Sequence, residues 1–226
     1  MPWQASRLPR APKRADKFPA LTGTCDVPPF VQAILLLNVI GFLLQGLSPE
    51  FMMRSFALWP GRGGGLSALP WNAPWELITY SFLHGDFMHL AFNMLAMWMF
   101  GAQVEQIWGT RRLAWTYFIS VVTGALCHVL VGAMFGAGGA PVIGASAGVF
   151  GIMLAYALLF PNTKIMLLIP PIPMPARVFV GLYAALSLFM GVTGTQQGVA
   201  HFAHLGGLIG GWIGYRYGAG WGKRLR

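Results

Sequence analysis

Ser146 and His204 carry the side chains best suited to nucleophilic chemistry in this sequence. Ser146 is the one hydroxyl in the run 142–151, VIGASAGVFG, whose small residues leave its oxygen open to close approach. A serine hydroxyl becomes a strong nucleophile when a base removes its proton, and histidine is the usual base. We therefore predict that Ser146 is the nucleophile and that His204 is its general base.

His201 is the alternative base, because it lies three residues before His204 and shares a helix face with it. We favour His204, whose depth in its helix matches that of Ser146 and which is followed at once by the glycine-rich face 206–211. Small residues at this spacing let two helices approach closely, as a Ser–His hydrogen bond requires. His201 is expected to be hydrated, at the mouth of the cavity that holds the pair.

When a carbonyl carbon is attacked, the negative charge that forms on its oxygen needs hydrogen-bond donors. His89 and Asn93 lie one helical turn apart on one face and are predicted to supply two side-chain donors. Backbone N–H groups at the start of the Ser146 helix are predicted to supply more, because the first turn of a helix leaves them unpaired. Phe150, four residues after Ser146, is predicted to pack against the base, and Gly144 to belong to a small packing face around Ser146.

Carboxylates are scarce near these residues. After Asp86 the only one in the sequence is Glu105, which falls at the opposite end of its predicted helix, some 20 Å from the site by helix rise. We therefore predict a Ser–His dyad with no acidic third member. Cys25 and Cys127 lack metal-ligand spacing, so neither a metal nor another cofactor is expected.

The composition places this chemistry in a membrane. Of the 226 residues, 56% are hydrophobic and 9% are charged, whereas a soluble domain has about 25% charged residues. The net charge of +9 could suggest nucleic acid, but the basic residues lie at span ends rather than on one patch. The sequence therefore predicts an all-α, polytopic domain over 27–218 whose partner is the lipid bilayer and not nucleic acid.

Apolar runs of nearly the length that crosses a bilayer predict six spans. Their approximate bounds are 29–47, 78–104, 113–135, 144–160, 178–192 and 199–217. The connection 48–80 is too apolar for a free linker and too rich in proline for a span, so we expect it at the membrane interface. The basic segments 1–26 and 219–226 are predicted to be a disordered arm and a short tail.

The distribution of basic residues predicts the orientation. With six spans, 13 of the 15 lysines and arginines fall on one face of the membrane. Positive residues mark the cytoplasmic side, so both termini are expected there. His89, Ser146 and His204 then lie on three helices that run in the same direction, roughly 5 to 15 Å below the outer surface. Polar groups within a membrane are costly, so their similar depth indicates a shared site.

The order of these motifs resembles that of the rhomboid family of intramembrane serine proteases. The family's G-x-S element matches Ser146 and the two residues before it, its H-x-x-x-N element matches His89 to Asn93, and its A-H-x-x-G element includes His204. The stretch from Glu105 to Arg112 also looks like the family's end of the second span. The resemblance covers about 70–217. One departure is Ala147, where the family often has glycine directly after the nucleophile.

This resemblance implies a six-helix core with the dyad in a water-filled cavity open to the outside, and cleavage of single-span membrane proteins. It implies that Ser146 is the nucleophile, that His204 is the base, and that His89 and Asn93 stabilise the oxyanion. The segment 48–80 is expected to lie laterally in the outer leaflet, and 194–198 to act as a lid. A bacterial inner (plasma) membrane is the expected location, with the mitochondrial inner membrane as the alternative.

Three other interpretations of the sequence are considered. The run 144–148 also fits the nucleophile elbow of soluble α/β-hydrolases, but no acid lies between Ser146 and His204 and the flanks are spans. A small transporter or channel would place charged groups near the midplane of the membrane. A rhomboid-like protein that binds transmembrane clients without cutting them remains the main alternative, and the presence of both serine and histidine argues against it.

Overall fold

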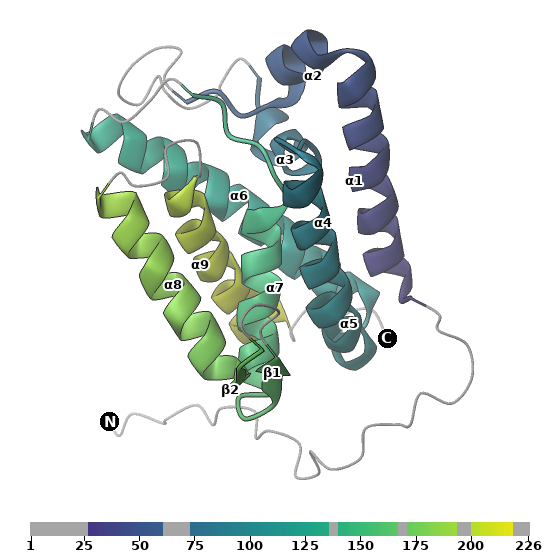
Figure 1. The fold of residues 1–226 in the computed structure, drawn as a ribbon, viewed down its shortest axis with the longest axis vertical. Helices are drawn as coiled ribbons and strands as arrows, with labels where there is room; N and C mark the ends of the chain where they lie inside the picture. Colours follow the sequence, from purple (N-terminus) through teal and green to yellow (C-terminus); the bar gives the residue numbers. More distant parts are fainter. Residues whose placement is uncertain (1–26, 61–72, 136–139, 167–170, 194–199, 219–226) are drawn as a thin grey trace, which may run out of the picture.

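The computed structural model describes residues 27–60, 73–135, 140–166, 171–193 and 200–218 (Figure 1). The described chain is mostly helical, with one short β-hairpin. The predicted arm 1–26, the tail 219–226 and the lid 194–198 lie outside the described residues. The elements are α1 Pro29–Leu47, α2 Pro49–Phe56, α3 Glu76–Thr79, η2 Tyr80–Phe82, α4 Phe87–Ala96, the π-helical turn η3 Met97–Gly101, α5 Ala102–Trp108, α6 Thr110–Phe135, α7 Ser146–Leu159, β1 Lys164–Met166, β2 Pro173–Pro175, α8 Ala176–Thr193 and α9 His201–Tyr217.

Four helical segments of the described chain are long and apolar enough to cross a membrane: Pro29–Leu47, Phe87–Trp108, Thr110–Met134 and Ala176–Thr193. They indicate a multi-pass membrane protein, and they fall on the first, second, third and fifth predicted spans. The helices at the fourth and sixth predicted spans are shorter, with 14 residues in α7 and 17 in α9. Most residues of α7 are buried, as expected of a helix that is apolar on every face. It packs against α4, α6, α8 and α9 in the middle of the bundle (Figure 1).

The predicted start of the second span, at residue 78, is wrong. Residues 76–82 form two short turns, α3 and η2, and the long helix begins only at Phe87. Its first turn is capped by Asp86, whose Oδ1 accepts a hydrogen bond from the backbone N–H of His89 at 2.8 Å. An aspartate just before the first helical residue favours the start of a helix over its continuation. Asp86 therefore interrupts a stretch that hydropathy alone predicts to be one continuous span.

The connection between the second and third predicted spans, 105–112, is shorter than expected. Gly109 alone makes it, with a φ of 79°, and α6 starts at the next residue, Thr110. The proline-rich connection after α7 holds a feature that the sequence did not indicate. There β1 pairs with β2 in an antiparallel hairpin, with Ile165 opposite Met174.

Helices α7 and α9 pack closely against each other in the core. A β-carbon added at Gly207 would collide with the backbone carbonyl oxygen of Ala147, so only glycine permits this approach. On the neighbouring face of α9, the Thr123 hydroxyl of α6 donates to the Gly206 carbonyl at 2.8 Å. The glycine pattern in α9 thus holds this helix against both α6 and α7.

Candidate active site

Ser146 and His204 lie in direct contact. The Ser146 Oγ and the His204 Nε2 are 2.8 Å apart, a hydrogen-bond distance. Ser146 is the first residue of α7 and His204 the fourth of α9. Both helices begin at the same end of the bundle as α4 (Figure 1). The similar depth inferred from the sequence therefore corresponds to a real side-chain contact.

Aromatic rings surround the His204 imidazole. Phe150 stacks on it, with ring centroids 4.3 Å apart and planes at 10°, as the spacing from Ser146 predicts. Tyr183 of α8 packs in turn against Phe150, at 5.1 Å. The His201 ring is perpendicular to the His204 ring, with centroids 6.1 Å apart. Of these two histidines, His204 makes the hydrogen bond to Ser146. The expectation that His201 is hydrated was wrong, because only 7% of it is exposed.

The segment before Ser146 is held by backbone hydrogen bonds from distant parts of the chain. Leu58 and Val142 form an isolated antiparallel bridge, with N–H to oxygen distances of 3.1 and 2.8 Å. The Gly144 N–H donates to the carbonyl of Tyr80 at 2.9 Å. These bonds fix the direction in which the chain enters α7, and hence where the Ser146 hydroxyl points.

Gly144 is required by the backbone conformation and by the His89 ring, in addition to the small packing face predicted from the sequence. Its φ of 122° lies in the region that other residues rarely adopt. A β-carbon there would also lie 2.7 Å from Cε1 and 2.8 Å from Nε2 of His89, and 3.7 Å from the Ser146 Oγ. The missing side chain thus leaves the space in which the His89 ring edge approaches the serine.

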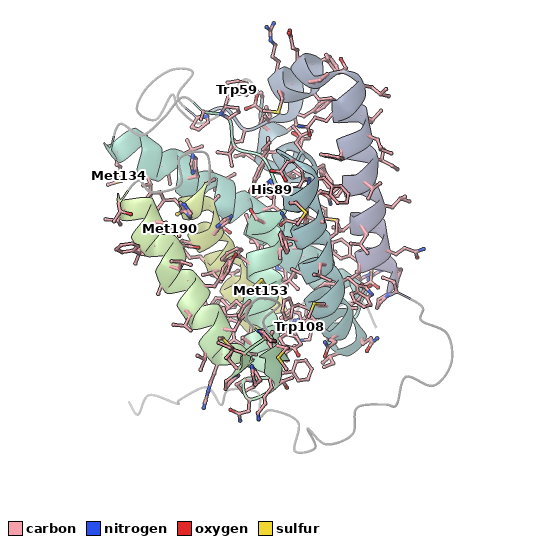
Figure 2. All side chains as sticks on the ribbon, viewed as in Figure 1. Trp59, His89, Trp108, Met134, Met153 and Met190 are labelled. Atoms are coloured by element: carbon pink, nitrogen blue, oxygen red, sulfur yellow. The ribbon has the colours of Figure 1, made fainter. Side chains whose placement is uncertain are left out.

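His89 presents its Nε2 to this space. Its other ring nitrogen, Nδ1, accepts a hydrogen bond from the Gly85 backbone N–H at 3.4 Å. A neutral imidazole has one donor and one acceptor nitrogen, so a proton on Nε2 matches this arrangement. His89 lies in the part of α4 toward Trp59, and Trp108 marks the opposite end of this helical segment (Figure 2). The neighbouring His84 ring packs edge to face on His89 at 5.0 Å.

Asn93 is buried one turn further along α4. Its Nδ2 donates to the backbone carbonyl of His89 at 2.8 Å. An asparagine amide has two N–H groups, so one of them is used within its own helix.

The backbone at the start of α7 adds further donors. The first backbone N–H of α7 that bonds within the helix is that of Val149, which donates to the Ala145 carbonyl at 3.0 Å, and no side chain caps the start of the helix. The N–H groups of residues 146–148 come before this first helical bond, and they are the further donors.

The carboxylates of the described residues bond away from His204. Both oxygens of Glu105 accept backbone N–H groups at the start of α1, from Phe30 and Val31 at 3.0 Å each. Glu76 accepts from the Trp59 N–H, Asp86 caps α4, and Glu50 pairs with Arg54 on the surface. This arrangement agrees with a dyad that has no acidic member.

Residues 72–219 match the family model of the Rhomboid domain. The chain belongs to the rhomboid family. The resemblance seen in the sequence, at 70–217, is thereby confirmed. This rhomboid chain is 31% identical over 142 residues to Rhomboid protein 1, mitochondrial, of Saccharomyces cerevisiae, covering 58% of this chain and 38% of that protein.

Two bacterial relatives are named as proteases. Rhomboid protease GlpG of Klebsiella pneumoniae is 30% identical over 136 residues, covering 59% of this chain and 47% of that protein. Rhomboid protease GluP of Bacillus subtilis is 29% identical over 156 residues, covering 67% of this chain and 28% of that protein. The rhomboid chain described here thus spans less than half the length of each of these three relatives.

Proposed function

We propose that this protein is an intramembrane serine endopeptidase that cleaves single-span membrane proteins near the outer face of the bilayer. The observation that carries the proposal is the 2.8 Å contact between the Ser146 Oγ and the His204 Nε2. The names of the bacterial relatives support the same activity. Ser146 is proposed as the nucleophile and His204 as the general base, with His89 and Asn93 as oxyanion donors, and no metal or other cofactor takes part.

In the first half of the reaction, the Ser146 oxygen attacks the carbonyl carbon of the scissile peptide while His204 Nε2 takes its proton. The carbonyl oxygen becomes an oxyanion, stabilised by the backbone N–H groups at the start of α7, by the His89 Nε2–H and by Asn93. When the intermediate collapses, the C–N bond breaks. His204 gives its proton to the leaving amine, and an acyl ester remains on Ser146.

Water completes the reaction. It attacks the ester carbon while His204 accepts one of its protons, and collapse of the second intermediate breaks the bond to Ser146. His204 then returns the proton to the serine oxygen, and the new carboxyl end leaves. Because Phe150 covers one face of the imidazole and the described carboxylates bond elsewhere, stacking takes the orienting role that an acid has in a triad.

The membrane arrangement follows from the same proposal. The four long helices, together with the shorter α7 and α9, make the six-span rhomboid bundle, with both termini in the cytoplasm. The protease domain is 27–218, flanked by the arm 1–26 and the tail 219–226. The bacterial inner (plasma) membrane is the proposed location. Cysteine accessibility at positions on either side of α6, measured in intact cells, tests the orientation.

The decisive experiment uses the purified full chain in liposomes with a single-span reporter protein. Wild-type protein should cut the reporter and should be labelled by a fluorophosphonate probe, and Ser146→Ala should do neither. Equal cleavage by wild type and Ser146→Ala would overturn the proposal. Binding of the reporter by wild type without cleavage or labelling would support the alternative, a non-catalytic rhomboid-like protein that binds transmembrane clients.

A further inference from the structure

Gln45 makes an unusual contact at the end of α1, outside the residues that match the rhomboid family model. Its side-chain amide bonds both polar groups of one backbone residue. The Gln45 Oε1 accepts the His84 N–H at 3.1 Å, and its Nε2 donates to the His84 carbonyl at 2.9 Å. Met53 of α2 lies 3.9 Å from the same Nε2 through its sulfur. The amide of Gln45 is therefore held in one orientation against the turn that precedes α4.

That turn is the support of His89. Gly85, next to His84, donates its N–H to the His89 Nδ1. Asp86 holds the His89 backbone N–H, and the His84 ring packs on the His89 ring. The three residues of the turn thus each contact His89, while Gln45 binds the turn from the other side. A continuous set of contacts runs from α1 to the ring nitrogen that faces Gly144 and Ser146.

We infer that Gln45 is a positioning residue for His89. By fixing the 84–86 turn, it keeps the Gly85 N–H aimed at Nδ1, and this keeps the proton on Nε2, where the oxyanion forms. The inference rests on the proposed protease function and assigns α1 a part in the reaction. A merely structural role would be to satisfy a buried peptide group and to dock α1. Docking has other sources, because Val31 and Ile34 are buried and Glu105 caps the start of α1.

The test compares Gln45→Met, which keeps the length of the side chain and loses both hydrogen bonds, with wild type in liposomes. The expected result is a fall in kcat of about tenfold or more with KM unchanged, since loss of a whole oxyanion donor lowers kcat by about 10²–10³. Ile34→Val, which trims a buried side chain on the same helix, is the control and should keep kcat. An unchanged kcat in Gln45→Met, or an equal fall in Ile34→Val, would overturn the inference.

A double-mutant cycle then asks whether Gln45 acts through His89. In a His89→Ala background, Gln45→Met should cause no further loss of kcat, because the group that it positions is already gone. The same fold loss in both backgrounds would mean that Gln45 acts by another route and would refute the inference.

A spectroscopic readout separates this inference from the protease proposal. In ¹⁵N-histidine-labelled protein, with signals assigned by single His→Gln variants, His89 should carry its proton on Nε2, and Gln45→Met should shift its signals. A proton on Nδ1 in wild type, or unmoved signals in Gln45→Met, would sink the inference whether or not the protein cleaves anything. Absence of cleavage by wild type with the expected spectrum would instead count against the proposed function alone.

Discussion

The phenyl ring of Phe150 lies parallel to the imidazole of His204, with the two centroids 4.3 Å apart. This stacking and the bond to Ser146 together restrict the ring of the proposed base in two directions. Offset-stacked aromatic contacts are worth about 0.5–1.5 kcal/mol beyond the area they bury. That is enough to bias the orientation of a side chain with few rotamers.

Replacement of Phe150 should therefore lower the rate more than it lowers stability. For Phe150→Leu we expect kcat to fall by up to about tenfold, since the contact is worth about 0.5–1.5 kcal/mol and about 1.4 kcal/mol corresponds to a tenfold change in rate. The measurement is cleavage of the single-span reporter at saturating substrate. Val149→Ala, at the adjacent buried position of α7, is the matched control and should keep the rate of the folded enzyme. Equal losses in the two variants would assign Phe150 to packing alone.

Gly144→Ala should be severe for two separate reasons. The backbone conformation there, with φ at 122°, costs a non-glycine residue about 1–3 kcal/mol. In addition, the new methyl group would lie 2.7 Å from the nearest His89 ring atom and displace it. We expect cleavage to fall by about a hundredfold, as for loss of an oxyanion donor, together with slower fluorophosphonate labelling of Ser146.

The control for Gly144 is a glycine with free space around it. Gly181 of α8 has no atom within 4 Å of the position that a β-carbon would occupy. Gly181→Ala should leave cleavage unchanged and be neutral or slightly stabilising, because alanine favours the helix by about 1 kcal/mol. Full activity of Gly144→Ala would show that neither strain nor the His89 contact matters at the site.

Glu105→Gln should lower stability without lowering the turnover of folded protein. The carboxylate, 3% exposed, accepts two backbone N–H groups of α1 and the Thr110 hydroxyl. Hydrogen bonds to a charged group contribute about 1.5–3 kcal/mol, so we expect a loss of that size in the free energy of unfolding in detergent micelles. Glu50→Gln is the control, because its ion pair with Arg54 is largely exposed and should contribute little. Loss of kcat with unchanged stability would contradict this assignment.

Asn93→Ala should be milder than His89→Ala. One N–H of the Asn93 amide bonds to the His89 carbonyl within α4, whereas the His89 ring borders Gly144 directly. We expect His89→Ala to lower kcat by about 10²–10³ and Asn93→Ala by about tenfold. Reporter cleavage under single-turnover conditions measures both, and the reverse order of effects would reassign the principal donor.

The sequence predicted the parts of the fold that depend on apolar length. The bounds of α1 were predicted to the residue, because Pro29 starts an apolar run that ends near Pro49. The second span starts later than predicted because apolar residues continue through the short turns α3 and η2, so hydropathy does not reveal the helix start that Asp86 caps. The β1–β2 hairpin was missed because three-residue strands leave almost no pattern.

At the candidate site, side-chain pairs were more predictable than the backbone that holds them. The contacts of His204 with Ser146 and Phe150 followed from depth and helical spacing. The Leu58–Val142 bridge and the two Gln45 bonds join segments far apart in the chain through main-chain atoms, which carry no sequence signature. A glycine two residues before the proposed nucleophile was a usable signal of unusual backbone conformation, but small-residue packing explained it equally well.

The contact of Gly207 with Ala147 limits how this protein can diversify. A β-carbon at Gly207 would lie 2.8 Å from the carbonyl carbon of Ala147, next to Ser146, so the helices that carry the proposed dyad meet through their main chains. Any larger residue at position 207 would push α7 and α9 apart. Substitutions that alter the specificity of the proposed protease are therefore expected in the outer helices, such as α8, because α7 and α9 leave no room for a larger side chain at this contact.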